Sequence, residues 1–172
     1  MTTVFIGGSR QLSRLNADIH QRLDRIIEKG LAIVVGDANG ADRAVQRYLS
    51  DKAYRPVTVF CMSHDCRNNV GGWPTKDVSA PRGARGFAYY STKDRAMADA
   101  ASHGLMLWDG ESKGTLSNTV TMVRQQKPVV VYFAPANAFE TIRTSVDIAR
   151  LLARCNNVAV KRFEQELDLA QA

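Results

Sequence analysis

The sequence predicts an α/β protein built on a Rossmann-like, doubly wound sheet of five or more mainly parallel strands flanked by helices, with extra C-terminal helices. Five short apolar runs are nearly continuous rather than alternating, which is typical of strands covered on both faces. Segments with helical periodicity separate these runs. Alternation of strand and helix favours a parallel sheet with right-handed crossovers.

Local patterns predict each element. The apolar runs predict strands over residues 4–6, 32–35, 57–60, 105–108 and 129–132. Apolar residues at helical spacing predict helices between them. The first stripe contains Leu12, Leu15, Ile19, Leu23 and Ile26 and ends at Gly30, and the second contains Ala41, Ala44, Val45, Tyr48 and Leu49. A helix over about 91–103 is expected to turn Ala96, Met97, Ala100 and Ala101 inward, and one from about 115 to bury Leu116, Val120 and Val123.

The C-terminal part, residues 137–172, is predicted to be helical. Asn137 and Glu140 have the spacing of a capping box. The helix that would follow carries Phe139, Ile142, Val146, Ala149 and Leu152, and a last helix from about 157 carries Val160, Phe163 and Leu167. These apolar faces are expected to cover the sheet or a second subunit, so we expect a homodimer or a larger homo-oligomer.

Residues 63–90 have no sustained periodicity and contain two of the five prolines and four of the twelve glycines. Structureless stretches of this length inside a compact domain are usually functional or disordered. Aromatic residues in the segment argue against disorder. We therefore expect a lid or a dimer arm, with Arg82, Arg85 and Tyr90 as the residues that reach a ligand.

Length and composition predict one domain, 1–172: 45% of the residues are apolar and 23% are charged. No apolar run approaches the roughly 20 residues that cross a bilayer, and the N-terminus does not resemble a signal peptide, so a cytoplasmic protein without membrane contact is expected. Three cysteines are an odd number, at spacings that give no disulfide framework. Cys61, His64 and Cys66 lack a fourth ligand, so neither a metal nor a required cofactor is expected.

The net charge of +6 lies entirely upstream of Glu140, which allows an anionic ligand there, although an ordinary solvated surface explains the charge as well. Three of the predicted strands end in unusual turns: GGSR at 7–10, GDANGAD at 36–42 and DGESKGT at 109–115. In an open parallel sheet such turns meet at the ligand crevice. Glycine lets backbone amides approach an anion, and the following helix N-terminus favours negative charge.

These turns predict a glycine-rich anion site. Its expected residues are Gly7, Gly8, Ser9, Arg10, Gly36, Asp37, Gly40, Ala41, Asp42, Asp109, Gly110, Ser112, Gly114 and Thr115. The alternative for any one turn is that it only caps a helix. Three turns at one edge favour the anion site.

In order along the chain, GGSR, GDANGADRAV, KDRAM with Ala98 and Asp99 behind it, and WDGESKGT resemble the SLOG superfamily of Rossmann-like nucleotide-binding domains. The superfamily includes the Lonely Guy phosphoribohydrolases and the DNA-processing protein that loads single strands in transformation. The resemblance spans about 4–132 and is strongest to an uncharacterised bacterial branch. It implies a small nucleotide or nucleotide-derived ligand and adds Lys93, Arg95 and Asn118 to the expected site.

Two positions depart from the family pattern. Lys93, with Arg95 nearby, stands where an arginine usually opens the segment before the fourth of the predicted strands. The glutamate that is catalytic in the Lonely Guy enzymes corresponds to Asn118 here. Asparagine can hydrogen-bond a ribose hydroxyl but cannot act as a carboxylate base. Lonely Guy hydrolysis is therefore not expected, and binding of a nucleotide, as in a sensing or signalling module, is the preferred function.

Two alternatives stay open. One is cleavage or transfer at an N-glycosidic bond, with Asp109 or Asp37 as the catalytic carboxylate and Asp42 and Asp94 nearby; each aspartate has the alternative of capping a turn or helix. The other is single-stranded nucleic-acid binding, because cations and aromatics alternate around the 63–90 segment and the sequence pI is 9.5. These residues are Arg67, Lys76, Arg82 and Arg85 with Trp73, Phe87, Tyr89 and Tyr90.

Overall fold

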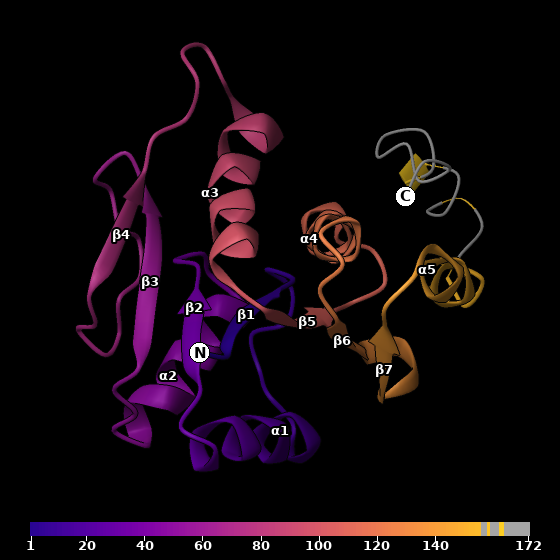
Figure 1. The fold of residues 1–172 in the computed structure, drawn as a ribbon, viewed down its shortest axis with the longest axis horizontal. Helices are drawn as coiled ribbons and strands as arrows, with labels where there is room; N and C mark the ends of the chain where they lie inside the picture. The colour runs from indigo at the N-terminus through magenta and orange to yellow at the C-terminus, as the bar shows by residue number, and fades with distance from the viewer. Residues whose placement is uncertain (156–157, 159–161, 164–172) are drawn as a thin grey trace.

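A computed structural model describes residues 1–155, 158, 162 and 163. Its centre is one seven-stranded sheet in the order β4-β3-β2-β1-β5-β6-β7 (Figure 1). The strands are β1 (Thr3–Gly8), β2 (Ala32–Val35), β3 (Val57–Met62), β4 (Thr75–Val78), β5 (His103–Trp108), β6 (Val129–Phe133) and β7 (Ala138–Ile142). All neighbours pair in parallel except β6 and β7. The doubly wound, mainly parallel sheet predicted from the sequence is confirmed.

Helices cover both faces of the sheet. They are α1 (Ala17–Glu28), α2 (Ala41–Asp51), α3 (Gly86–Ala100), α4 (Lys113–Arg124) and α5 (Ser145–Leu152). The first two lie on one face and the other three on the opposite face (Figure 1). Phe5 and Ile6, consecutive in β1, belong to the two different cores because strand side chains alternate. No helix in the described ranges is long and apolar enough to span a membrane.

The helix predicted from Asn137 is wrong in its first half. Asn137 adopts a left-handed conformation at the end of the short 3-10 helix Ala134–Ala136, which reverses the chain. β7 then pairs antiparallel with β6, and Phe139 lies opposite Tyr132. The capping box that the structure does contain joins Thr144 and Asp147 and begins α5.

The last predicted helix falls mainly on residues outside the described ranges, including Val160 and Leu167. Phe163 is described, is buried, and lies beside the ring of Trp108.

Other boundaries also differ from the prediction. Leu12 and Leu15 precede α1, because Asn16 caps that helix by accepting a hydrogen bond from the Ile19 amide. The segment 63–90 is not structureless, since it contains β4 and the first turn of α3. α3 begins at Gly86 rather than at about 91, and His103 belongs to β5. Inward-facing residues of α3 are Lys93, Met97 and Ala98, whereas Ala100 is exposed.

The expectation of unpaired cysteines is also wrong, because Cys61 and Cys66 form a disulfide. Cys61 lies near the end of β3, and Ser63 and His64 adopt left-handed conformations that turn the chain back. The turn brings the two Cα atoms to 4.9 Å, within the range of a disulfide. Cys155 is the free cysteine.

Candidate functional site

A cavity of about 630 Å³ lies at the carboxyl ends of β1 and β5, between the turns that follow these strands and α3. β1 and β5 are neighbours at the point where the strand order reverses. This is the place at which doubly wound sheets bind ligands. The turns after these two strands therefore meet as the sequence predicted.

Most of the predicted site residues line this cavity. They are Gly7, Gly8, Ser9, Arg10, Asp42, Tyr90, Lys93, Asp109, Ser112, Gly114, Thr115 and Asn118. The other predicted site residues, all in the described part of the chain, do not line the cavity: Gly36, Asp37, Gly40, Ala41, Arg82, Arg85, Arg95 and Gly110. Sequence analysis did not assign ligand contacts to Phe5, Gln11, Ala38, Gly86, Ser91, Met97, Glu111 or Arg162, which also line it.

The turn after β2 supports the turn after β1. Ala41 donates a backbone hydrogen bond to the carbonyl of Ser9 at 3.1 Å. Gly40 has a φ of +79°, and a Cβ at this position would collide with the backbone of Arg10. Close packing between two turns thus explains this glycine.

Gly114 is different, because a Cβ there would meet nothing within 4 Å. It lies in the first turn of α4 and lines the cavity. First-turn amides of a helix have no acceptor within the helix, and the helix dipole makes this end favourable for an anion. The cavity therefore has one wall suited to negative charge.

Asp109 orders the turn after β5. One carboxylate oxygen accepts hydrogen bonds from the amides of Glu111 and Ser112, and the other accepts from the hydroxyl of Ser9 at 2.8 Å. Ser112 in turn caps α4 by accepting from the amide of Thr115. Asp109 thus connects the two turns of the cavity, and both of its oxygens already have donors.

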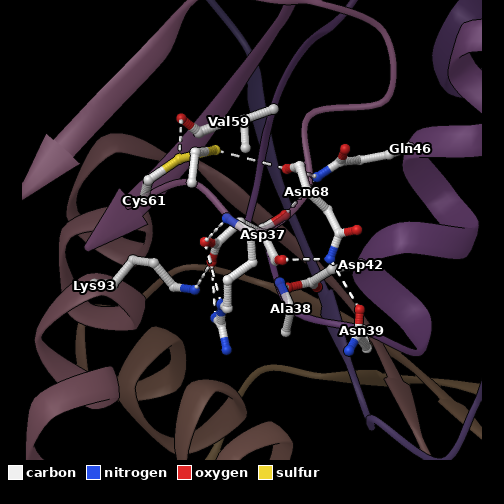
Figure 2. Close-up of polar contacts among 12 residues, drawn as sticks. Asp37, Ala38, Asn39, Asp42, Gln46, Val59, Cys61, Asn68 and Lys93 are labelled. Carbon is white, nitrogen blue, oxygen red and sulfur yellow. Dashed lines mark hydrogen bonds and ion pairs between the residues drawn. A yellow bond between two sulfur atoms is a disulfide. The ribbon is translucent and has the colours of Figure 1, made fainter. Parts of the chain in front are cut away.

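Asp37 does not line the cavity and is paired with two cations, Arg67 and Lys93. Figure 2 shows its contact with Lys93. Lys93 approaches one carboxylate oxygen at 2.6 Å, and Arg67 donates from its backbone and its guanidinium. Burial alone would raise the pKa of Asp37, but the hydrogen bonds from Arg67 and Lys93 outweigh it and lower the pKa to about 2. The carboxylate is therefore ionised at neutral pH and positions Lys93 and Arg67, both of which line the cavity.

Two other aspartates face the cavity with raised pKa values. Burial raises the pKa of Asp42 to about 7, against the opposing charge of Lys93. Burial raises the pKa of Asp94 to about 6, although Lys93 and a hydrogen bond from Asn118 lower it. Because α3 begins at Gly86, Asp94 lies in the helix interior and does not cap the start of the helix, which was the alternative to a functional role.

Aromatic and cationic side chains surround the cavity. Arg10 and Arg67 lie over the ring of Tyr90, at 5.4 Å and 4.8 Å from its centroid. Lys113 lies 4.1 Å from the centroid of Phe87, whose side chain remains 42% exposed. Aromatic rings beside cations suit both base stacking and phosphate binding.

The cysteines do not form the metal group considered from sequence. His64 points to Asp77 and is exposed. Asp37, Cys61 and Cys66 offer ligand atoms within 4.8 Å of one another. The Asp37 carboxylate is already paired with two cations and the two sulfurs are bonded to each other, so these groups are not vacant ligands.

No protein-family model matches the chain, and no curated protein sequence does either. Among solved structures, the chain is similar to DNA processing protein A from Helicobacter pylori, with 17% sequence identity and a TM-score of 0.59. The similarity covers 97% of this chain and 80% of that chain, and the solved structure concerns that protein's single-stranded DNA binding mode. A likeness at this identity establishes a related fold.

Proposed function

We propose that this chain binds a nucleotide or nucleotide-derived anion in the cavity at the ends of β1 and β5, as a SLOG-type domain. The observation that carries the proposal is that the N-terminus of α4 and the Arg10 side chain line one cavity. A helix N-terminus with its dipole and a guanidinium are the parts of a phosphate site. Phe87 and Tyr90 line the same cavity and offer rings on which a base stacks.

Gly114→Val tests this proposal. Since a Cβ at Gly114 meets open space, the variant is expected to fold, while its side chain obstructs the approach of an anion to the α4 amides. Calorimetric titration with nucleoside mono-, di- and triphosphates should show binding to the wild type and at least tenfold weaker binding to the variant. Ala100→Val is the matched control, because Ala100 is an exposed helical residue outside this cavity.

Equal affinities of the wild type and a folded Gly114→Val variant would place the ligand elsewhere. Absence of binding to every nucleotide tested, at millimolar concentration, would refute the proposal.

Single-stranded nucleic acid is a second candidate. It is favoured by the fold shared with a protein whose solved structure concerns single-stranded DNA binding. Arg10 and Arg67 beside the half-buried ring of Tyr90, and Lys113 beside the exposed ring of Phe87, would also suit a nucleic-acid strand. Fluorescence anisotropy with a labelled 20-nucleotide thymidine strand tests it: such binding should weaken steeply with salt, because phosphate contacts release counterions.

Cleavage of the ligand is a separate question for which the two catalytic candidates from sequence offer little support. Asp37 is paired with cations, and both Asp109 oxygens have donors. We therefore expect the bound nucleotide to remain intact, as judged by chromatography for free base after prolonged incubation. Release of base that is lost in Asp109→Asn would restore the enzymatic alternative.

A further inference from the structure

The cavity has two chemically different walls, both within reach of one ligand. Gly114 and Asn118 are four residues apart in α4 and therefore lie on one face of the helix, separated by about 6 Å along its axis. The Gly114 end suits an anion. At the Asn118 end lies Asp94 of α3, on whose pKa the Asn118 side chain acts.

The second wall consists of acceptors. Asp94 and Asp42 both line the cavity, and Asp42 is only 9% exposed. One oxygen of Asp42 accepts from the Ala38 amide at 3.2 Å. A carboxylate offers about four lone-pair sites, so this bond leaves further acceptor capacity at Asp42. Ionised carboxylates repel phosphate and accept hydrogen bonds from hydroxyl groups.

Resting on the proposed function, we infer that the cavity selects ribonucleotides over 2′-deoxyribonucleotides, with Asp94 and Asp42 accepting hydrogen bonds from the ribose hydroxyls. One helical turn between the α4 amides and Asn118 corresponds to the span of a nucleoside 5′-phosphate from its phosphate to its ribose hydroxyls. A site built to pair with a hydroxyl rejects the analogue that lacks it, because its buried acceptors lose their donor.

Competing ligand groups make different predictions. Exocyclic amino groups of a base could also donate hydrogen bonds to a carboxylate. If these groups bind Asp94, removal of the 2′-hydroxyl has no effect, whereas exchange of adenine for hypoxanthine weakens binding. Comparison of matched nucleotides therefore separates ribose recognition from base recognition.

Calorimetry with the 5′-monophosphates of adenosine, guanosine, cytidine and uridine, each beside its 2′-deoxy counterpart, tests the inference. For each ribonucleotide that binds, the deoxy form should bind the wild type at least tenfold more weakly. Asp94→Ala should reduce this ratio below threefold, mainly by weakening the ribonucleotide. Asp99→Asn is the control, since Asp99 is an exposed residue of the same helix that accepts from Gln125 outside the cavity.

The pH dependence of binding to the wild type gives a second test, which does not require a variant that folds. The groups that act on Asp94 are Lys93 of α3, Asn118 of α4 and the arginines Arg10 and Arg67, and those that act on Asp42 are Lys93, Asp94, Asp37 and the Ala38 amide. With pKa values of about 6 and 7, both carboxylates gain protons as the pH falls from 8 to 5.5. The ratio of ribonucleotide affinity to deoxyribonucleotide affinity should decrease over this range. Titration of the phosphate affects both members of a pair equally and therefore does not change the ratio.

Equal wild-type affinities for ribonucleotides and deoxyribonucleotides at pH 8 would overturn the inference and leave the proposed function intact. If a folded Asp94→Ala variant keeps the wild-type ratio of ribonucleotide to deoxyribonucleotide affinity, the role of Asp94 is overturned. Failure of every nucleotide to bind would instead refute the proposed function on which the inference rests. If Asp94→Ala does not fold, the wild-type comparison alone decides.

Discussion

Lys93 Nζ lies 2.6 Å from a carboxylate oxygen of Asp37, and both side chains are almost fully buried. The same carboxylate binds the backbone and guanidinium of Arg67. One aspartate at the end of β2 thus fixes α3 and the turn after β3 relative to each other. Lys93 and Arg67 both line the cavity, so this buried ion pair determines the shape of one of its walls.

Asp37→Ala should lower the free energy of unfolding by about 3–5 kcal/mol, because it leaves the buried Lys93 without its counter-charge. Urea denaturation measures the change. Asp37→Ala with Lys93→Met should recover part of the loss. Asp24→Ala is the control, since Asp24 pairs with Lys52 at the surface and should cost within about 1 kcal/mol. If Asp37→Ala and Asp24→Ala lower the free energy of unfolding equally, a structural role for Asp37 is contradicted.

Asp42 should make stability depend on pH in the direction opposite to an ordinary carboxylate. Its pKa rises from 3.8 to about 7 on folding, because burial penalises the charged form. Its stabilising effect is therefore complete below about pH 4 and is lost as the pH rises through 7. Asp42→Asn should be more stable than the wild type at pH 8, by up to about 4 kcal/mol, with the gain vanishing near pH 4.

Chemical denaturation at several pH values measures this difference. Asp51→Asn, at an exposed position of α2, is the control measured beside it. A constant difference for Asp42→Asn would show that Asp42 is not buried in its charged form.

The Cys61–Cys66 disulfide should add stability in oxidising solution. A short loop of this kind contributes roughly 2 kcal/mol in the chain-entropy account. For a chain of this length, a phosphine reductant should lower the melting temperature by about 4–8 °C. Cys66→Ser should melt at the same temperature with and without reductant. Free thiols at Cys61 and Cys66 in protein purified without reductant would contradict the pairing.

The parts of the fold that local patterns encode could be predicted from sequence. The five apolar strands and the convergence of two glycine turns followed from continuous apolar runs and turn residues. β4 could not be found in this way, because its sequence TKDV is a largely exposed edge strand without an apolar pattern. β7 was missed because its pairing with β6 is a tertiary contact, while the spacing of Asn137 and Glu140 imitates a helix start.

The candidate site was predictable on the turns and less so elsewhere. The packing of helices and strands decides which carboxylates already have partners. The sequence alone does not show that Asp37 pairs with both Lys93 and Arg67. The importance of Asp94 depends on where α3 begins. The expected homodimer or larger homo-oligomer stays a prediction, which light scattering tests. Ile148 and Leu151 of α5 are already buried within their own chain and do not require a second subunit.

Hydrogen exchange with and without a nucleotide that binds in calorimetry tests the central claim most directly. Protection is expected in three segments: the turn at 7–11, the first half of α3 and the first turn of α4, because these line the cavity. Exchange in β7 and α5 should not change, since neither contributes to the lining among the described residues. Protection confined to β4 or α5, with none in the first turn of α4, would show that the nucleotide binds elsewhere.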